Sequence, residues 1–236
     1  MIRRISAILL CFAIAVSFIA CNDNADCNDN VEFKKTQNKT IVSDDGTEYT
    51  FVGNECDVWC FGEREFIGHV AGEENFLDNL TMTTKAGMYS VNGSKDTLVR
   101  YSPDNEFYSV YVKSDLLKTE ISLDNCIRFE FVKDLLSGRN NYSPSQKVIT
   151  ECEHFLTEIR SGKTAKDAGL YELIKQPDGM FKNLYVYGYL FGVVQEDINL
   201  VIPLKIMSFD DKAYSIELDG IEYVLPEEWI NELTVK

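Results

Sequence analysis

Residues 184–225 read LYVYGYLFGVVQEDINLVIPLKIMSFDDKAYSIELDGIEYVL, and this stretch decides the fold class. Aromatic residues recur at every second position from 185 to 191, which is the spacing of side chains on one face of a strand. Asp219-Gly220 is a two-residue turn signal between the segments 213–218 and 221–225. That pattern predicts an antiparallel hairpin and favours an antiparallel sheet in this part of the chain.

Pro203 lies inside the apolar segment 198–207. Proline has no N–H to donate to a neighbouring strand, so within sheets it is confined to edges, strand starts and bulges. We therefore expect this segment to be an edge strand, or to be bulged at Pro203.

The aromatic row on the strand 184–194 is a candidate binding surface. Its members are predicted to share one face: Tyr185, Tyr187, Tyr189 and Phe191. If exposed, they would form a flat surface on which sugar rings or a protein partner could stack. The same pattern fits core packing beneath helices, and this alternative stays open.

A helix is predicted before the sheet. Ser143, Pro144 and Gln146 together form a helix start signal, and Ser161-Gly162 ends the segment, with the glycine expected in the left-handed conformation. The apolar residues between them recur on one helical face: Val148, Ile149, Cys152, Phe155, Leu156 and Ile159.

Two further helices are shorter. Thr164 is expected to begin a second helix that runs through Leu173, and Pro226 to begin a terminal helix. The terminal helix would direct three apolar residues inward: Trp229, Ile230 and Leu233.

The region 48–132 reads as strand-rich. Asn92-Gly93 is a strong hairpin signal, and residues 127–131 alternate between apolar and charged side chains. We therefore predict an α+β fold, rich in antiparallel β-sheet, with two or three helices in the C-terminal half. The globular region is expected to span 48–236, and the turn-rich residues 137–145 could form an internal boundary.

Composition places the chain among globular proteins and against several functions. Of 236 residues, 38 are acidic and 23 basic, for a net charge of −15, and 45% are hydrophobic. These values disfavour a disordered chain and a polytopic membrane protein. The acidic balance disfavours nucleic-acid binding, which depends on basic residues to neutralise phosphates.

The first twenty residues have the pattern of a secretory signal. Arg3 and Arg4 precede an apolar run from Ile5 to Ala20, which is short for a membrane-spanning helix and ends abruptly at Cys21. An uncleaved membrane anchor is the alternative.

The sequence Phe18-Ile19-Ala20-Cys21 resembles the lipobox of bacterial lipoproteins. The resemblance covers residues 1–21 and implies cleavage of the signal 1–20, a diacylglyceryl group on Cys21, and palmitate-type acylation of the new amino terminus. Two or more chains suffice for stable anchoring. The protein would then sit in the cell envelope, in the outer membrane facing the periplasm or the surface, with residues 21–47 as a tether.

Five cysteines remain in the exported chain beyond Cys21. An oxidising compartment favours disulfides, and the plausible partners are Cys56 with Cys60, if they share a turn, and Cys126 with Cys152. Cys27 is then the odd one. Cys56, Cys60 and His69 have only a superficial likeness to a zinc half-site, so no metal is predicted.

The sequence contains no motif that assigns catalytic residues or a cofactor. Acidic pairs are plentiful, but with 38 acids some pair will meet glycosidase spacing by chance. The leading interpretation is a lipid-anchored envelope protein with a non-catalytic module that binds a protein or glycan. The alternatives are a hydrolase that uses a carboxylate pair on envelope or external polymers, and an acidic inhibitor or immunity-type protein.

Overall fold

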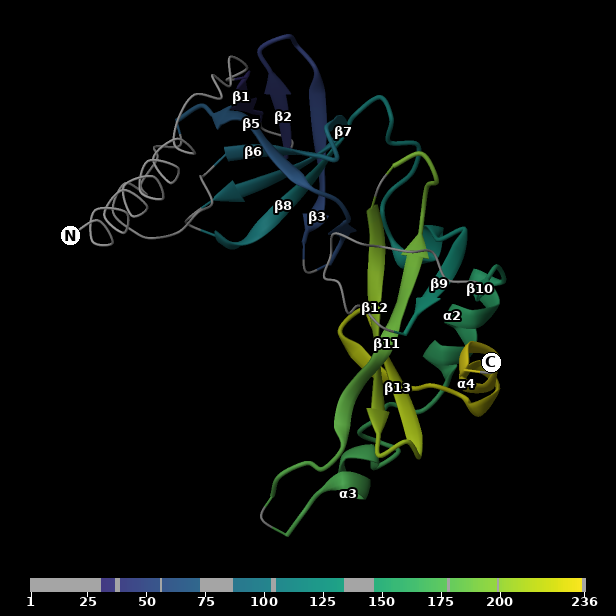
Figure 1. Ribbon diagram of the computed structural model, residues 1–236. Coiled ribbons are helices and arrows are strands. Elements are labelled where there is room, and N and C mark those ends of the chain that lie inside the picture. The colour runs from purple at the N-terminus through teal and green to yellow at the C-terminus, as the bar shows by residue number, and fades with distance from the viewer. Residues whose placement is uncertain are drawn as a thin grey trace, which may run out of the picture.

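The structure is a computed structural model that describes residues 31–36, 39–55, 57–72, 87–102, 105–133, 147–177, 179–198 and 200–234. The molecule is elongated, with an all-strand barrel lobe at one end and a helix-covered sheet lobe at the other (Figure 1). The described chain is strand-rich, and its three α-helices all lie in the C-terminal half. This confirms the predicted fold class, but the closed barrel was not predicted.

The barrel lobe is a closed sheet in the order β1-β2-β3-β8-β7-β6-β5. Neighbouring strands are antiparallel except for β1 and β5, which pair in parallel and close the barrel. Closure leaves no free edge along these strands. The strand bounds are β1 (Val31–Lys35), β2 (Thr40–Ser43), β3 (Glu48–Asn54), β5 (Arg64–Val70), β6 (Gly87–Val91), β7 (Ser94–Ser102) and β8 (Asn105–Lys113).

Strand alternation separates the barrel interior from its outer surface. Leu98 packs in the interior cluster, while its neighbour Val99 belongs to a cluster on the outside. The buried members of the interior cluster are Phe33, Ile41, Tyr49, Ile67, Val70, Met88, Leu98 and Tyr111. The predicted hairpin at Asn92-Gly93 joins β6 to β7, and both residues have positive φ, as a two-residue hairpin turn requires.

The predicted tether, residues 21–47, extends too far, because its later residues form two strands of the barrel. Residues 31–35 and 40–43 are β1 and β2, and Phe33 and Ile41 are both buried in the barrel interior. Two short strands could be overlooked because their polar residues face solvent, while the alternate apolar residues fill the barrel.

The sheet lobe has the strand order β10-β9-β11-β12-β13-β14, with every pairing antiparallel. A further short strand, β4 (Trp59–Cys60), pairs with β12. The other bounds are β9 (Arg128–Val132), β10 (Val148–Ile149), β11 (Leu184–Val193), β12 (Leu200–Phe209), β13 (Ala213–Leu218) and β14 (Ile221–Val224).

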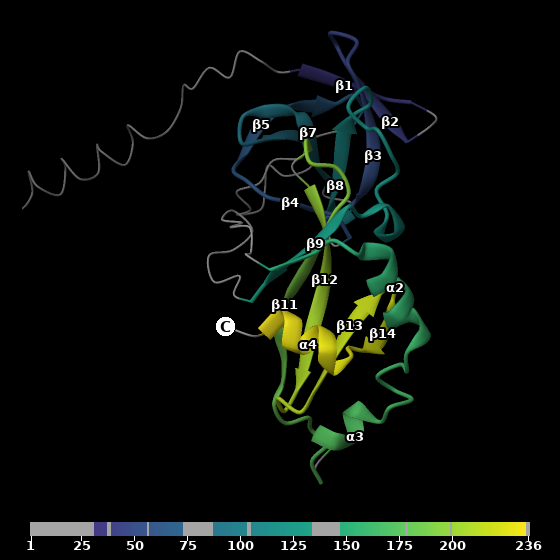
Figure 2. The same ribbon diagram turned by 90° about the vertical axis from the view of Figure 1, so that its right-hand side faces the viewer.

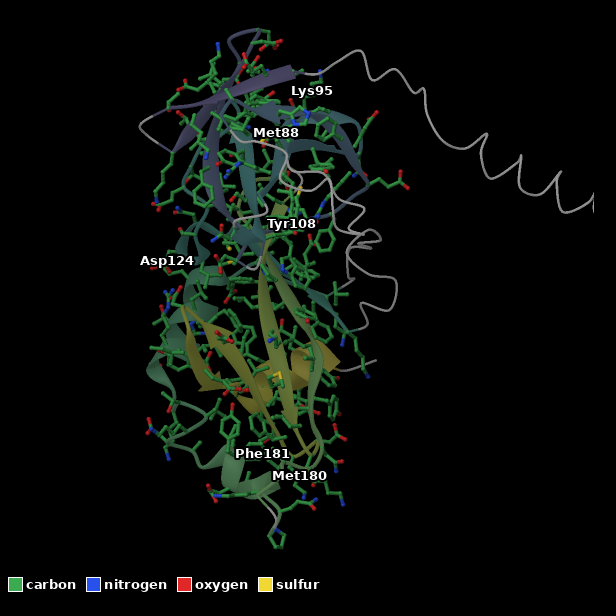
Figure 3. The ribbon with its side chains drawn as sticks, turned by 90° about the vertical axis from the view of Figure 1, so that its left-hand side faces the viewer. Met88, Lys95, Tyr108, Asp124, Met180 and Phe181 are labelled. Atoms are coloured by element: carbon green, nitrogen blue, oxygen red, sulfur yellow. The ribbon has the colours of Figure 1, made fainter. Side chains whose placement is uncertain are left out.

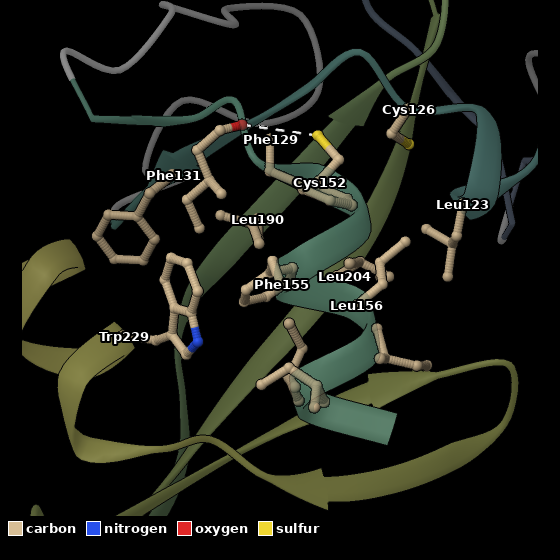
Figure 4. Close-up of a cluster of buried hydrophobic side chains, with 14 of the residues drawn as sticks. Leu123, Cys126, Phe129, Phe131, Cys152, Phe155, Leu156, Leu190, Leu204 and Trp229 are labelled. Atoms are coloured by element: carbon tan, nitrogen blue, oxygen red, sulfur yellow. Dashed lines mark hydrogen bonds between the residues drawn. The ribbon is translucent and has the colours of Figure 1, made fainter. Parts of the chain in front are cut away.

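Helices cover one face of this sheet (Figures 1 and 2). They are α2 (Cys152–Ser161) and α4 (Glu227–Thr234). The shorter α3 (Leu170–Ile174) packs against Phe209 on the other face, at the end of the sheet, and η1 (Leu123–Asn125) is a single 3₁₀ turn. Figure 4 shows the core between α2, α4 and the sheet. The Phe155 ring meets Trp229 edge to face with centroids 5.0 Å apart, and lies 5.3 Å from Phe129.

The helix predicted for 143–162 begins later than expected. Val148 and Ile149 form β10 and pair with Glu130 and Phe129 of β9, so α2 starts at Cys152; residues 143–146 lie outside the described residues. Both residues are β-branched, and strand pairing buries Ile149 as a helix would have done.

The ends of the predicted helices also differ from expectation. Gly162 has φ −76°, which is not left-handed. Thr164 accepts a hydrogen bond from the Asp167 N–H at 3.0 Å, but the following turns reach helical geometry only at Leu170. The terminal helix is confirmed as α4, which starts at Glu227, with Trp229 and Leu233 buried.

The two lobes share a hydrophobic core at their junction. Val58 and Cys60, in and beside β4, pack with Val99 and Val110 of the barrel's outer surface and with Leu200 of β12. Figure 2 shows β4 between the barrel and the sheet. The main chain crosses between the lobes through residues 114–127; the predicted boundary at 137–145 lies outside the described residues.

Candidate functional site

Strand β12 changes partner along one of its sides. It pairs with β4 at Leu200 and Val201, and with β13 from Ile206 to Phe209. On the other side it pairs with β11 throughout 202–209. Among the described strands, residues 202–205 therefore have a partner on one side only.

The prediction that residues 198–207 form an edge strand, or are bulged at Pro203, is wrong, because β12 lies between β11 and β13 in the sheet. Pro203 pairs with Phe191 of β11 and lies in the four-residue gap between β4 and β13, where β12 has an open edge. The register shift in this pair of strands lies elsewhere, between Val186 and Gly188 of β11. A proline is compatible with an interior strand here because no neighbour needs its N–H.

A groove with a volume of about 840 Å³ opens at this gap, and we call it the junction groove. Its lining comes from β3 and β4, from the crossing segment near η1, from β11 and β12, and from the β13–β14 turn. Most of these residues are apolar, and the aromatic or charged ones are Asp57, Trp59, Tyr189, Lys205, Glu217 and Asp219. A concave, mainly apolar site with a few polar groups is the usual form of a ligand site.

Two aromatic side chains line the groove. The ring centroids of Trp59 and Tyr189 are 5.0 Å apart, at an interplanar angle of 49°. Tyr189 stacks nearly parallel to Phe191 at 6.0 Å, and Phe191 is fully buried. Trp59 retains 9% exposure and Tyr189 is half-buried, so packing from behind holds both rings in place while they line the groove.

The charged residues of the groove divide into paired and unpaired groups. Arg160 binds Asp219 at 2.9 Å and Asp124 at 2.6 Å, and these contacts raise the Arg160 pKa. Asp57 and Glu217 are exposed and have no ion-pair partner within 4.0 Å among the described residues. The charges of Asp57, Glu217 and Lys205 sum to −1, and Arg160 offsets only one of the two negative charges of Asp124 and Asp219.

The predicted aromatic row is not one surface, because the bulge in β11 divides it. Tyr189 and Phe191 lie on the junction side, whereas Tyr187 packs on the helix side, with its ring 6.0 Å from Phe131. Tyr185 is exposed and donates a hydrogen bond to Asp211, which raises the Tyr185 pKa. An extra residue in a strand reverses the facing of the side chains that follow, so strict alternation fails here.

The cysteines give no disulfide among the described residues. Cys60, Cys126 and Cys152 are buried, and Cys56 lies outside the described residues. Cys60 belongs to the junction cluster, whereas Cys126 and Cys152 share the core beneath α2. Pairing of Cys126 with Cys152 is not formed in the structure and stays a prediction.

Burial makes these thiols poor nucleophiles. It raises the pKa of Cys60 and of Cys126 to about 12, so the reactive thiolate is scarce at neutral pH. Cys152 donates to the Ile149 carbonyl at 3.7 Å, the contact dashed in Figure 4. In the structure the three side chains act as small hydrophobic residues.

A carboxyl pair lies on the surface between α2 and α4, away from the junction groove. Glu228 hydrogen-bonds to Glu158, which raises the Glu228 pKa and lowers that of Glu158. Glu158 also accepts from the Trp229 indole at 2.9 Å, and His154 lies 3.7 Å from it. Within the described ranges, no cluster of three or more His, Cys, Asp or Glu side chains is arranged to hold a metal ion.

An exposed apolar tip lies at the end of the sheet lobe farthest from the barrel (Figure 3). Leu173, Met180 and Phe181 are 60%, 67% and 49% exposed. Figure 3 labels Met180 and Phe181 there. The tip offers apolar area only, whereas the junction groove combines aromatic rings, charges and backbone groups, so the groove is the candidate site.

Two predictions concern the N-terminal region. Cys21 and the signal 1–20 lie outside the described residues, so lipidation stays a prediction. In the part of the chain that the structure describes, no helix has the length and hydropathy needed to cross a bilayer.

The residues of the groove were mostly missed by the sequence analysis. Asp57 and Trp59 lie between β3 and β5, while Lys205 and Glu217 lie about 150 residues later. Only Pro203 marked the position, because it was expected at an edge strand or a bulge. Comparison of the chain with protein-family models, curated proteins and solved structures finds no match.

Proposed function

We propose that the protein is a lipid-anchored protein of the cell envelope, that its globular part is a binding module rather than an enzyme, and that the junction groove is its ligand site. The observation that carries the proposal is the groove itself, where both lobes contribute to an apolar lining with an aromatic wall and exposed charges. Sites of this kind are common at junctions between structural units.

The anchor is proposed from the resemblance of Phe18-Ile19-Ala20-Cys21 to a lipobox. Replacement of the acylated thiol in Cys21→Ala is expected to abolish labelling by radioactive fatty acid and to release the protein from membranes in its own host. A Ser17→Ala variant, altered in the same leader but not at the acylated residue, is the control and should behave as wild type. A Cys21→Ala protein that still labels and sediments with membranes would show that the anchor is wrong.

The ligand site is tested by charge reversal inside and outside the groove. Glu217→Lys changes an exposed groove residue, and Glu172→Lys makes the same change on α3. Partners that co-purify with the lipidated wild type should be lost with Glu217→Lys and retained with Glu172→Lys. Equal loss or equal retention by both variants would mean that the groove is not the site.

A hydrolase remains the second candidate because Asp57 and Glu217 both line the same groove. A glycosidase needs two carboxylates about 5 to 9.5 Å apart across a cleft. If the protein cleaves a polymer, Glu217→Gln should abolish cleavage while leaving binding intact. A binding module shows no turnover in either form.

A further inference from the structure

We propose that the junction groove binds an extended peptide segment carrying basic side chains, held by main-chain hydrogen bonds to the open edge of β12. This inference rests on the proposed function and specifies its ligand. The occupant is a segment of another protein, recognised by its backbone and by its positive charge.

The backbone of β12 supplies the first argument. Among the described strands, residues 202–205 pair with β11 only, and they line the groove. In an antiparallel strand, alternate residues direct both the N–H and the C=O to the same side. Pro203 has no N–H for β11, so its carbonyl and both polar groups of Lys205 are directed to the groove. An extended peptide added here can donate two hydrogen bonds and accept one, as in β-strand addition.

The two ends of the gap limit what can bind. β4 and β13 occupy the same side of β12 on either side of the gap, which spans four residues, or roughly 13 Å. The site therefore fits a short strand of about four residues, and it cannot extend into an open-ended sheet with further copies. Pro203 and Lys205 at the edge are residues that discourage indiscriminate pairing.

Exposed carboxylates beside the gap favour a peptide with basic side chains. Asp57 lies just before β4 and Glu217 lies in β13, so the two exposed carboxylates flank the gap without an ion-pair partner within 4.0 Å among the described residues. Asp219 already has an ion-pair partner in Arg160, which it shares with Asp124. Basic side chains on the peptide would meet these carboxylates, while its alternate apolar side chains would contact Trp59 and Tyr189.

A glycan is the competing ligand, because aromatic rings and carboxylates also suit sugars. The peptide is favoured because it satisfies the open backbone edge as well as the carboxylates. The Trp59 ring is only 9% exposed, which leaves little flat area for a sugar ring.

The test uses Trp59 as a reporter inside the groove. The chain has two tryptophans, so Trp229→Phe leaves Trp59 as the only indole, and the fold of this background is checked by circular dichroism. The probes are capped pentapeptides of sequence Val-Lys-Val-Lys-Val and Val-Glu-Val-Glu-Val, an N-methylated form of the first, and chitotetraose. Binding is followed by Trp59 fluorescence and by calorimetry.

The lysine peptide is expected to bind at least about tenfold more tightly than the glutamate peptide, and N-methylation to weaken it at least about tenfold. The double variant Asp57→Lys/Glu217→Lys should reverse the preference. Asp96→Lys/Glu172→Lys, the same charge change at exposed positions outside the groove lining, should leave it intact.

Equal binding of the two peptides, no binding by either, or binding of chitotetraose alone would overturn the inference. If Glu217→Lys still removes a native partner, these results contradict the peptide ligand but not the binding function of the groove. If Glu217→Lys removes no partner, they contradict both. The two failures are therefore distinguishable.

Discussion

The barrel lobe and the sheet lobe differ in whether their strands leave an unpaired edge. The barrel joins β1 to β5 and closes, so every strand has two neighbours and the side chains fill the interior. The sheet lobe stays open and buries one face beneath α2 and α4, and residues 202–205 of β12 have no second neighbour among the described strands. Closure gives a rigid support, whereas the open sheet leaves backbone groups available for a ligand.

The comparison also shows that the lobes are joined by packing and not by a linker alone. Leu200 of β12 lies in one cluster with Val99 and Val110 of the barrel, and Cys60 of β4 completes it. Both lobes therefore hold the groove walls, and disruption of either lobe should disturb the site. Three substitutions test this relation.

The largest effect is expected for Phe155→Ala in the sheet lobe. Phe155 is fully buried against Phe129 and Trp229, so truncation leaves a cavity and should lower the free energy of unfolding by about 3–5 kcal/mol. Because the junction core couples the lobes, fluorescence of Trp59 and Trp229 should report one shared transition in urea. Phe181→Ala, at an exposed position, should change stability by less than about 0.5 kcal/mol. A second loss of β-sheet circular dichroism, at a urea concentration above the tryptophan transition, would show that the lobes unfold independently.

A smaller effect is expected where the barrel closes. A Cβ on Gly68 would lie 1.9 Å from the Val31 carbonyl oxygen, so Gly68→Ala forces β1 and β5 apart and should cost about 3 kcal/mol. Gly46→Ala is the matched control, because open space surrounds Gly46 and only its φ of +85° opposes alanine, at a cost of about 1 kcal/mol. Thermal unfolding measures both variants. If they lose equal stability, the close approach at Gly68 does not matter for closure.

The smallest effect concerns the carboxyl pair on the helix-covered face. The hydrogen bond to Glu158 raises the Glu228 pKa, so its stabilising contribution is complete below the unfolded pKa and is lost as pH rises through the folded pKa. Glu228→Gln keeps a hydrogen-bond donor without a charge. The urea midpoint of unfolding of Glu228→Gln should equal that of wild type at pH 4 and exceed that of wild type at pH 7.

The control for this substitution is Glu227→Gln, which removes the same charge from the adjacent residue of α4. A pH dependence of equal size in both variants would assign the effect to net charge rather than to the pair.

Local patterns in the sequence predicted much of the secondary structure. Asn92-Gly93 and Asp219-Gly220 both form the expected hairpin turns, since these residues accept positive φ at little cost. The helix predicted for 143–162 is wrong at Val148 and Ile149, because these residues pair with β9. Local signals cannot weigh a distant partner against a helix, so β10 was not predictable from its own residues.

The candidate site was predicted only in outline. Pro203 was expected to mark an edge strand or a bulge, whereas β12 is an interior strand in which residues 202–205 lack a second partner among the described strands, and the row from Tyr185 to Phe191 was wrongly assigned to one face. The bulge before Gly188 depends on how β11 pairs with β12, and pairing between strands is decided by tertiary packing. Asp57, Trp59 and Glu217 carry no signal of their own until the fold brings them together.

By itself, the sequence determined the fold class, the hairpins, the terminal helix and the acidic charge, because these depend on short-range backbone preferences and on composition. Only the tertiary structure decided the barrel closure, the division of the aromatic row and the gap between β4 and β13. Each of these depends on contacts between residues far apart in the chain, whose formation is governed by the burial of shared apolar surface rather than by any local pattern.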